Sequence, residues 1–430
     1  MTGTVRRVRS RWSLLAEIGR LPGVIRLLVL SQLVFNIGFY LVVPYLFGYL
    51  VGDLALAGWL VGLVLGLRTF SQQGLFFLGG MLADRFGAKP VILAGCGLRV
   101  LGFLLLGQVE SVPGIVAGAL LTGFAAALFS PAVESLLAHE AGSTDRDGSA
   151  HRSDVFALFA VASEVGAVVG PVLGAVLLLA DFQVVCVVAA AVFVAVGLVH
   201  LKWLPHHGAP HAAEPVLAGW RVVLGNRAFL VFAAGYAGYL VSYNQLYLAL
   251  PAELHRATGS EAALGWLFAL SSLMVVLGQL PTTAWARRVL GASRGIVAGF
   301  VCMAAAFAVV AVAALFPPAG IGAVVPAIAM VVLLTLGQML AVPLAKDAVP
   351  RLASERRLGA YFGILHSVGG LAVLGGSTTT GALLELGDGS GAVAVTPWLA
   401  LTAVPVASAV VMGWVSRRRS LAAATSSGAG

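Results

Sequence analysis

Three charged side chains stand inside long apolar stretches of this sequence, where burial makes a charge costly. They are Glu164, Arg68 and Arg99. A low dielectric raises the proton affinity of a carboxylate, so Glu164 could gain and lose a proton during a working cycle. A static ion pair with Arg68 or Arg99 is the alternative. We predict proton coupling at Glu164, with Glu134 as the second candidate and His366 as a further protonatable group, for which a satisfied buried histidine is the alternative.

Neutral polar side chains recur at helical spacing in other apolar runs. Gln32, Asn36 and Tyr40 are four residues apart and therefore share one helix face. A second stripe holds Tyr236, Tyr239, Tyr243 and Tyr247. Aromatic and amide groups with few charges would suit amphiphilic or lipophilic organic molecules. Ordinary helix packing or an interfacial aromatic belt is the alternative, and we favour it for Tyr247.

A short polar segment from Gly79 to Pro90 separates two apolar runs. It is too short for a domain and predicts a tight connection at a membrane surface. Within it, Asp84 could cap a neighbouring helix and pair with basic residues. A simple turn shaped by Gly87 and Pro90 is the alternative.

The composition indicates whether these residues lie in water or in a lipid bilayer. The chain has 430 residues, of which 60% are hydrophobic and 10% charged, and its mean hydropathy is +0.98. Soluble domains carry roughly 25% charged residues. The sequence therefore predicts a polytopic membrane protein with the lipid bilayer as a partner. The net charge of +8 does not indicate nucleic-acid binding, because the bases fall in short clusters between apolar runs, as topology signals do.

A membrane-spanning helix needs about 20 apolar residues. The sequence predicts an all-α fold of twelve such spans, at approximately 24–50, 57–80, 89–109, 113–138, 154–179, 183–204, 227–250, 262–285, 293–316, 321–346, 358–384 and 393–415. With both termini placed in the cytoplasm, all 26 bases fall in cytoplasmic segments except Arg256, Arg68 and Arg99. This asymmetry predicts an N-in, C-in orientation.

The spans predict two six-helix bundles. We expect a basic cytoplasmic tail at 1–23, an N-terminal bundle at 24–204, a linker at 205–226, a C-terminal bundle at 227–416 and a cytoplasmic tail at 417–430. The linker contains His206, His207 and His211. A metal site there is the alternative to the solvated linker that we expect, and we predict no metal. Gly58-Trp59-Leu60 and Gly265-Trp266-Leu267 open two spans at one offset, which favours parallel repeats.

Two motifs carry a resemblance to a known family. The segment Gly80-x-Leu82-Ala83-Asp84-Arg85-x-Gly87-x-Lys89 resembles the loop signature of the major facilitator superfamily. The segment from Gly166 to Gly174, with Gly170 and Pro171, looks like the antiporter motif of its drug–proton exporters. The stretch from Leu65 to Leu106 is similar to bacterial multidrug exporters of the twelve-span type.

This resemblance implies roles for individual residues. The loop would act as a conformational latch through Gly80, Asp84, Arg85, Gly87 and Lys89, with its partner at the start of span eleven, around Leu358 to Tyr361. Gly166, Gly170, Pro171 and Gly174 would pack span five closely, with span eight as the expected neighbour. The implied substrate cavity contains Gln32, Asn36, Tyr40, Arg68, Tyr239, Tyr243 and Gln338. Arg99 would be an intramembrane charge partner with a structural role inside its own half.

One departure from the family pattern concerns span four. Many drug–proton exporters carry an arginine four residues before a glycine there, but this sequence has Ala119 before Gly123. Arg68 or Arg99 could take its place.

Together these features predict a secondary transporter in the inner (plasma) membrane that exports drugs or similar compounds in exchange for protons. An importer or facilitator of a small metabolite on the same fold is the alternative. No metal-protease motif, nucleotide-binding loop or catalytic triad pattern appears within the spans, so we expect no enzyme. We further expect a monomer that uses no cofactor other than the proton as coupling ion.

Overall fold

The computed structural model describes residues 21–146, 152–205, 223–318, 320–352, 358–386 and 392–427, and in these ranges the regular structure is helical throughout. The expected tail 1–23 and the expected linker 205–226 therefore lie largely outside the described residues. Backbone polar groups in lipid must be bonded within their own helix, which explains why apolar runs of this length fold as helices.

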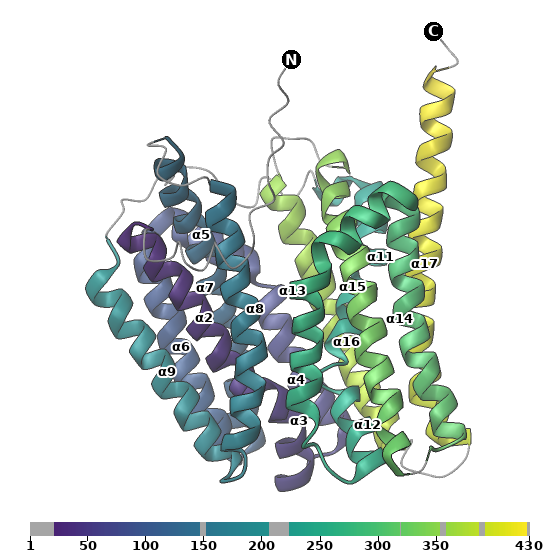
Figure 1. Ribbon diagram of the computed structural model, residues 1–430, viewed down its shortest axis with the longest axis horizontal. Coiled ribbons are helices and arrows are strands. Elements are labelled where there is room, and N and C mark those ends of the chain that lie inside the picture. Colours follow the sequence, from purple (N-terminus) through teal and green to yellow (C-terminus); the bar gives the residue numbers. More distant parts are fainter. Residues whose placement is uncertain are drawn as a thin grey trace.

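Two bundles stand side by side (Figure 1). The first contains α2 (Gly23–Val42), η2 (Val43–Tyr45), α3 (Leu46–Gly48), η3 (Tyr49–Asp53), α4 (Gly58–Gln73), α5 (Phe76–Phe86), α6 (Ala88–Gln108), α7 (Val112–Arg146), α8 (Arg152–Leu177) and α9 (Phe182–Trp203). The second contains α11 (Arg227–Asn244), α12 (Ala249–Thr258), α13 (Leu264–Val289), α14 (Gly291–Leu315), η4 (Gly320–Val324), α15 (Val325–Leu352), α16 (Leu358–Leu386) and α17 (Ala392–Ser427).

Among the described residues, 10 helical segments are long and apolar enough to cross a membrane. The twelve spans expected from the sequence are therefore not all present by this measure. Two helices, α11 and α16, occupy the remaining expected positions but are not among the ten. Both are rich in glycine and in tyrosine, serine or threonine. The helix α11 lines the pocket described below, and α16 packs between α4 and α11.

Several spans are interrupted. The first changes its helical geometry at Pro44, which lacks a backbone donor. The second breaks at Gly74 into α4 and α5. The seventh ends at Asn244 and continues through a turn into α12. Irregular backbone at such depth is tolerated where protein or a cavity surrounds it.

The start of α2 and the end of α17 lie on the same face of the molecule (Figure 1). The opposite face, which carries α3 and α12, is called the distal face here. The two bundles meet through α4 against α16 and α8 against α13. Near the distal face, Gly58 contacts the Gly381 carbonyl, and a Cβ on Gly265 would lie 3.0 Å from the Pro171 carbonyl. Small residues thus let the backbones of the two halves touch.

Candidate functional site

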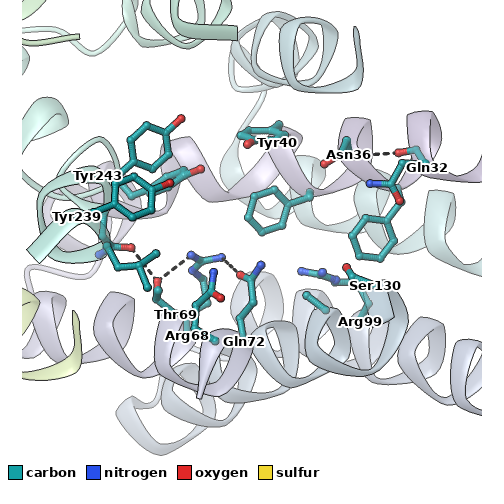
Figure 2. Close-up of a pocket in the computed structure, with 17 residues that line it drawn as sticks. Gln32, Asn36, Tyr40, Arg68, Thr69, Gln72, Arg99, Ser130, Tyr239 and Tyr243 are labelled. Atoms are coloured by element: carbon teal, nitrogen blue, oxygen red, sulfur yellow. Dashed lines mark hydrogen bonds between the residues drawn. The ribbon is translucent and has the colours of Figure 1, made fainter. Parts of the chain in front are cut away.

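A cavity of about 220 Å³ lies between the two halves, among α2, α4, α6, α7 and α11. In Figure 2 the labelled side chains of α2 lie across the pocket from those of α4 and α6. The lining residues are Gln32, Phe35, Asn36, Phe39, Tyr40, Arg68, Thr69, Gln72, Gln73, Arg99, Ala126, Ser130, Tyr239, Leu240, Tyr243, Asn244 and Tyr247.

The α2 side of the pocket is held by hydrogen bonds to α8. The Asn36 amide nitrogen donates to Ser163 Oγ at 2.9 Å, and that of Gln32 donates to the same oxygen at 3.4 Å. The spacing of four residues, seen in the sequence, places Tyr40 on the same face. This wall therefore presents amides and an aromatic ring in fixed orientations.

Arg68 begins a polar chain that joins the two halves. Its Nη2 donates to Thr69 Oγ1 at 2.9 Å, and its Nη1 donates to the Gln72 side-chain oxygen at 3.4 Å. Thr69 donates in turn to Asn244 Oδ1 at 2.8 Å, and Asn244 Nδ2 donates to Ser377 Oγ at 2.9 Å. The guanidinium is thus oriented by two neutral partners on its own helix, and one of them, Thr69, is bonded to the other bundle (Figure 2).

Arg99 is completely buried, with 0% of its surface exposed. Its guanidinium carbon lies 4.9–5.7 Å from the ring centroids of Phe35, Phe39, Phe103 and Phe193, distances at which aromatic faces attract a cation. Among the residues that the structure describes, none offers a hydrogen-bond partner to its three side-chain nitrogens. Arg99 also lines the pocket, and its structural role inside its own half stays a prediction.

Glu164 is half-buried on α8 and is not one of the lining residues. Its charge nevertheless acts on the pocket tyrosines Tyr40, Tyr243 and Tyr247. Within the described part of the chain, no ion pair joins it to Arg68 or Arg99. The alternative of a static pair is therefore wrong in this conformation, while proton coupling stays a prediction.

The other two proton candidates make contacts between the halves. His366 Nδ1 lies 2.9 Å from the Gln73 side-chain oxygen, and its ring stacks on Phe76 with centroids 5.3 Å apart. Glu134 is exposed on α7 and interacts electrostatically with Lys346 of α15. His366 is thus a hydrogen-bonded histidine next to the pocket, and Glu134 lies outside it.

Most predicted cavity residues converge on this pocket, namely Gln32, Asn36, Tyr40, Arg68, Tyr239 and Tyr243. Gln338 was predicted to line the cavity, but neither it nor any other residue of α15 is among the lining residues of this pocket. Tyr247 was favoured as a belt residue, but the turn after α11 brings it into the pocket. Sequence reasoning missed Thr69 and Ser130 as lining residues. Their only signal was a small polar group at membrane depth.

The polar loop forms a tight turn. Gly87 has φ +85°, a backbone conformation that side chains rarely adopt, and it separates α5 from α6. Lys89 is buried and donates to the Leu204 carbonyl at 2.7 Å, within its own bundle. Arg85 is exposed, and the Asp84 side chain lies outside the described part. The latch and its Gly80 position stay predictions.

The partner expected for the latch is only partly described. At the start of α16, Tyr361 accepts a hydrogen bond from Asn226 at 3.1 Å, so it binds within its own half. The side chains of residues 358–360 lie outside the described part. The helices α5 and α16 do approach each other at another point, since a Cβ on Gly363 of α16 would lie 3.3 Å from Phe77 Cβ of α5.

The glycine face of α8 packs against α2. The prediction that this face packs against span eight is therefore wrong. A Cβ on Gly166 would lie 2.6 Å from the Leu33 carbonyl, and one on Gly174 would lie 2.5 Å from that of Leu41. A Cβ on Gly170 would lie 2.6 Å from Tyr40 Cβ. Span eight (α13) instead meets α8 at Pro171. The Pro171 carbonyl also accepts a hydrogen bond from the Tyr45 hydroxyl.

The chain resembles known proteins over most of its length. It matches the model of the Major Facilitator Superfamily over residues 28–377. The uncharacterized MFS-type transporter Rv0849 of Mycobacterium tuberculosis is 41% identical over 366 residues, which cover 84% of this chain and 85% of that protein. Multidrug resistance protein MdtH of Aeromonas salmonicida is 30% identical, over 90% of this chain and 93% of its own.

Solved structures share the fold. The POT family transporter PepTSo superposes with a TM-score of 0.75 at 17% identity, covering 93% of this chain and 99% of that chain. The nucleoside transporter NupG superposes with a TM-score of 0.73 at 16% identity, covering 92% and 99%.

Proposed function

Because this chain belongs to the Major Facilitator Superfamily, we propose that it exports small amphiphilic or lipophilic organic compounds in exchange for protons. It is a transporter rather than an enzyme, and a multi-pass protein of the inner (plasma) membrane. The observation that carries the proposal is the pocket between the halves, whose tyrosines, phenylalanines and amides suit organic molecules. Relatives named as multidrug resistance proteins support this substrate range.

In this proposal the two halves rock about the pocket, so that it opens to each side of the membrane in turn. The two helices α11 and α16 complete twelve crossings, and both termini lie in the cytoplasm. The contacts of α4 with α16 and of α8 with α13 close the pocket on the distal face, which would be extracellular. The loop around Asp84 would hold the opposite face shut in the other state.

Proton coupling is assigned to Glu164. Glu164 is an acidic side chain on α8 at membrane depth, and its charge acts on three pocket tyrosines. Loading and loss of its proton would therefore change the pocket's electrostatics. His366, bonded to Gln73 across the halves, is the second group whose protonation would act directly on the interface.

The test is transport by purified protein in vesicles loaded with a fluorescent aromatic dye. A proton gradient of the exporting polarity should drive dye across the membrane, and a proton uncoupler should abolish the movement. Protein-free vesicles and vesicles without a gradient are the controls. Gradient-independent movement would contradict proton exchange.

The second candidate is an importer or facilitator, which the shared fold allows. Uncoupler-insensitive uptake down the dye's own gradient would favour it over export.

A further inference from the structure

The pocket between the halves carries two positive charges and no negative one on its walls. Arg68 and Arg99 are among the 17 lining residues, and none of those described residues is acidic. Arginine stays protonated in proteins, so both charges persist in every state of the cycle. Glu164 on α8 acts on the pocket tyrosines, but within the described residues no ion pair joins it to either arginine.

Arg99 has every donor of its guanidinium free. Its Nε, Nη1 and Nη2 are buried, and no hydrogen-bond acceptor reaches them from the described part of the chain. The four surrounding phenyl rings attract the cation, but they carry no oxygen that could accept a hydrogen bond from its N–H groups. A buried charge without such a partner is a cost that proteins keep where it has a function.

Arg68 lines the same pocket as Arg99. Two of its nitrogens donate to the neutral oxygens of Thr69 and Gln72, and its Nε has no partner. The guanidinium carbons of Arg68 and Arg99 each lie 5.3 Å from the centroid of the Phe39 ring, and their charges repel each other. An anion that reaches both arginines would relieve this repulsion and accept the free donors.

We infer that the pocket selects acidic aromatic compounds, whose carboxylate binds between Arg68 and Arg99. This assignment rests on the proposed function and narrows its substrates from amphiphiles in general to organic anions. The ring of such a compound would lie against Tyr239, Tyr243 and Tyr247, and the charge-assisted hydrogen bonds would fix its orientation. A cationic compound of the same size is rejected by the two fixed charges.

The test compares three ligands of one shape on the purified full-length protein in detergent. They are 2-naphthoate, the neutral 2-naphthamide and the cationic 2-naphthylmethylamine, and binding is followed by ligand-induced thermal stabilisation. Naphthoate should bind at least about tenfold more tightly than the amide. The amine should bind more weakly than either.

Substitutions then locate the anion. Arg68→Gln and Arg99→Gln should each remove most of the preference for naphthoate over the amide, and Arg99→Lys should retain part of it. Arg294→Gln removes an exposed charge from α14 and should leave the preference intact. The melting temperature of ligand-free Arg99→Gln should equal or exceed that of the parent, because the variant no longer buries an unpaired charge.

Three results would overturn the inference: equal binding of the three ligands, tighter binding of the amine, or no binding of naphthoate at millimolar concentration. A preference unchanged in both arginine variants would also overturn it. Because the assay measures binding without any gradient, a charge preference that persists while dye export fails would refute the proposed function alone. Export without the preference would refute the anion site alone.

Discussion

At the scale of single residues, the ionisable groups near the pocket are kept apart. Glu164 stands on α8 and does not line the pocket, whereas the lining residues Arg68 and Arg99 stand on α4 and α6. Since the carboxylate is not neutralised by either arginine, its protonation can change without breaking an ion pair. The structure thus separates a group that can titrate from two that cannot.

The first prediction concerns Glu164→Gln. A permanently neutral amide cannot release a proton, so gradient-driven transport should fall by at least about tenfold, while ligand binding to purified protein stays within about twofold of the parent. Vesicle transport with and without a pH gradient measures the first effect. Glu110→Gln, which changes an exposed carboxylate between α6 and α7, is the matched control. Retained gradient-driven transport in Glu164→Gln would refute the coupling role.

A second ionisable residue, Glu261, lies at the distal face before α13. Its carboxylate reaches across to Gly48 of the other half. Burial, and then the charge of Asp53, raise its pKa to about 7. Because the folded protein holds this proton after the unfolded chain has lost it, stability falls as the pH rises from the ordinary glutamate value to about 7.

The second prediction follows from this loss of stability with rising pH. The melting temperature of the parent in detergent should decrease between pH 5 and pH 8 by an amount equivalent to about 2–3 kcal/mol. In Glu261→Gln this part of the decrease should disappear. A Glu110→Gln variant should keep the parent's profile. Identical profiles for the parent and Glu261→Gln would show that the proton does not stabilise the distal face.

At the scale of elements, α8 packs closely against α2 because glycines at the contact have no side chains. Gly166, Gly170 and Gly174 repeat every four residues and meet backbone atoms or Cβ atoms of α2. In lipid, such close approach replaces the hydrophobic drive that packs helices in water. The same contact fixes Asn36 beside Ser163, so this packing positions one wall of the pocket.

The third prediction is that Gly170→Val separates these helices. The new side chain would clash with Tyr40 and with the Ile37 carbonyl, where a Cβ alone would lie at 2.6 and 2.9 Å. Overpacking of this kind costs about 1–3 kcal/mol, so melting temperature and transport should both fall. Gly97→Val on α6, where nothing lies within 4 Å of a new Cβ, is the control. Equal behaviour of the two variants would contradict the packing argument.

At the scale of the whole molecule, the two halves make equivalent contacts at the distal face. Gly58 opens α4 and meets α16, while Gly265 lies at the start of α13 and meets α8. These glycines belong to the two Gly-Trp-Leu segments that the sequence repeats. Each half therefore uses the same helix start to reach the other half. A transporter that works by rocking its halves must break both contacts in every cycle.

The fourth prediction tests this with a reversible cross-link. A Cβ on Gly58 would lie 2.9 Å from Glu385 Cβ but would also press on the Gly381 carbonyl, so α4 and α16 must move apart slightly in Gly58→Cys. Together with Glu385→Cys, in a chain without other cysteines, it should form a disulfide between the halves, and the reduced double variant is the reference for transport. Oxidation should stop transport and reduction should restore it. The control is Gly197→Cys with the native Cys96, whose Cβ positions would be 3.5 Å apart within one half. Transport that survives the oxidised 58–385 bridge would argue against rocking.

The sequence by itself determined the class of protein, the positions of most helices and the polar residues at membrane depth. These features depend on local properties, because the length of an apolar run and the spacing of residues along one helix need no neighbour. The stripe of Gln32, Asn36 and Tyr40 was predictable for that reason, as was the glycine face of α8. The family motifs added the fold.

Only the tertiary structure decided which helices are neighbours. It placed the α8 glycines against α2, brought Tyr247 into the pocket through the turn after α11, and left Gln338 outside. It also enclosed Arg99 in four rings that come from three separate helices, with no acceptor for its donors. Such surroundings arise from contacts between residues distant in the chain, and no pattern within one helix encodes them.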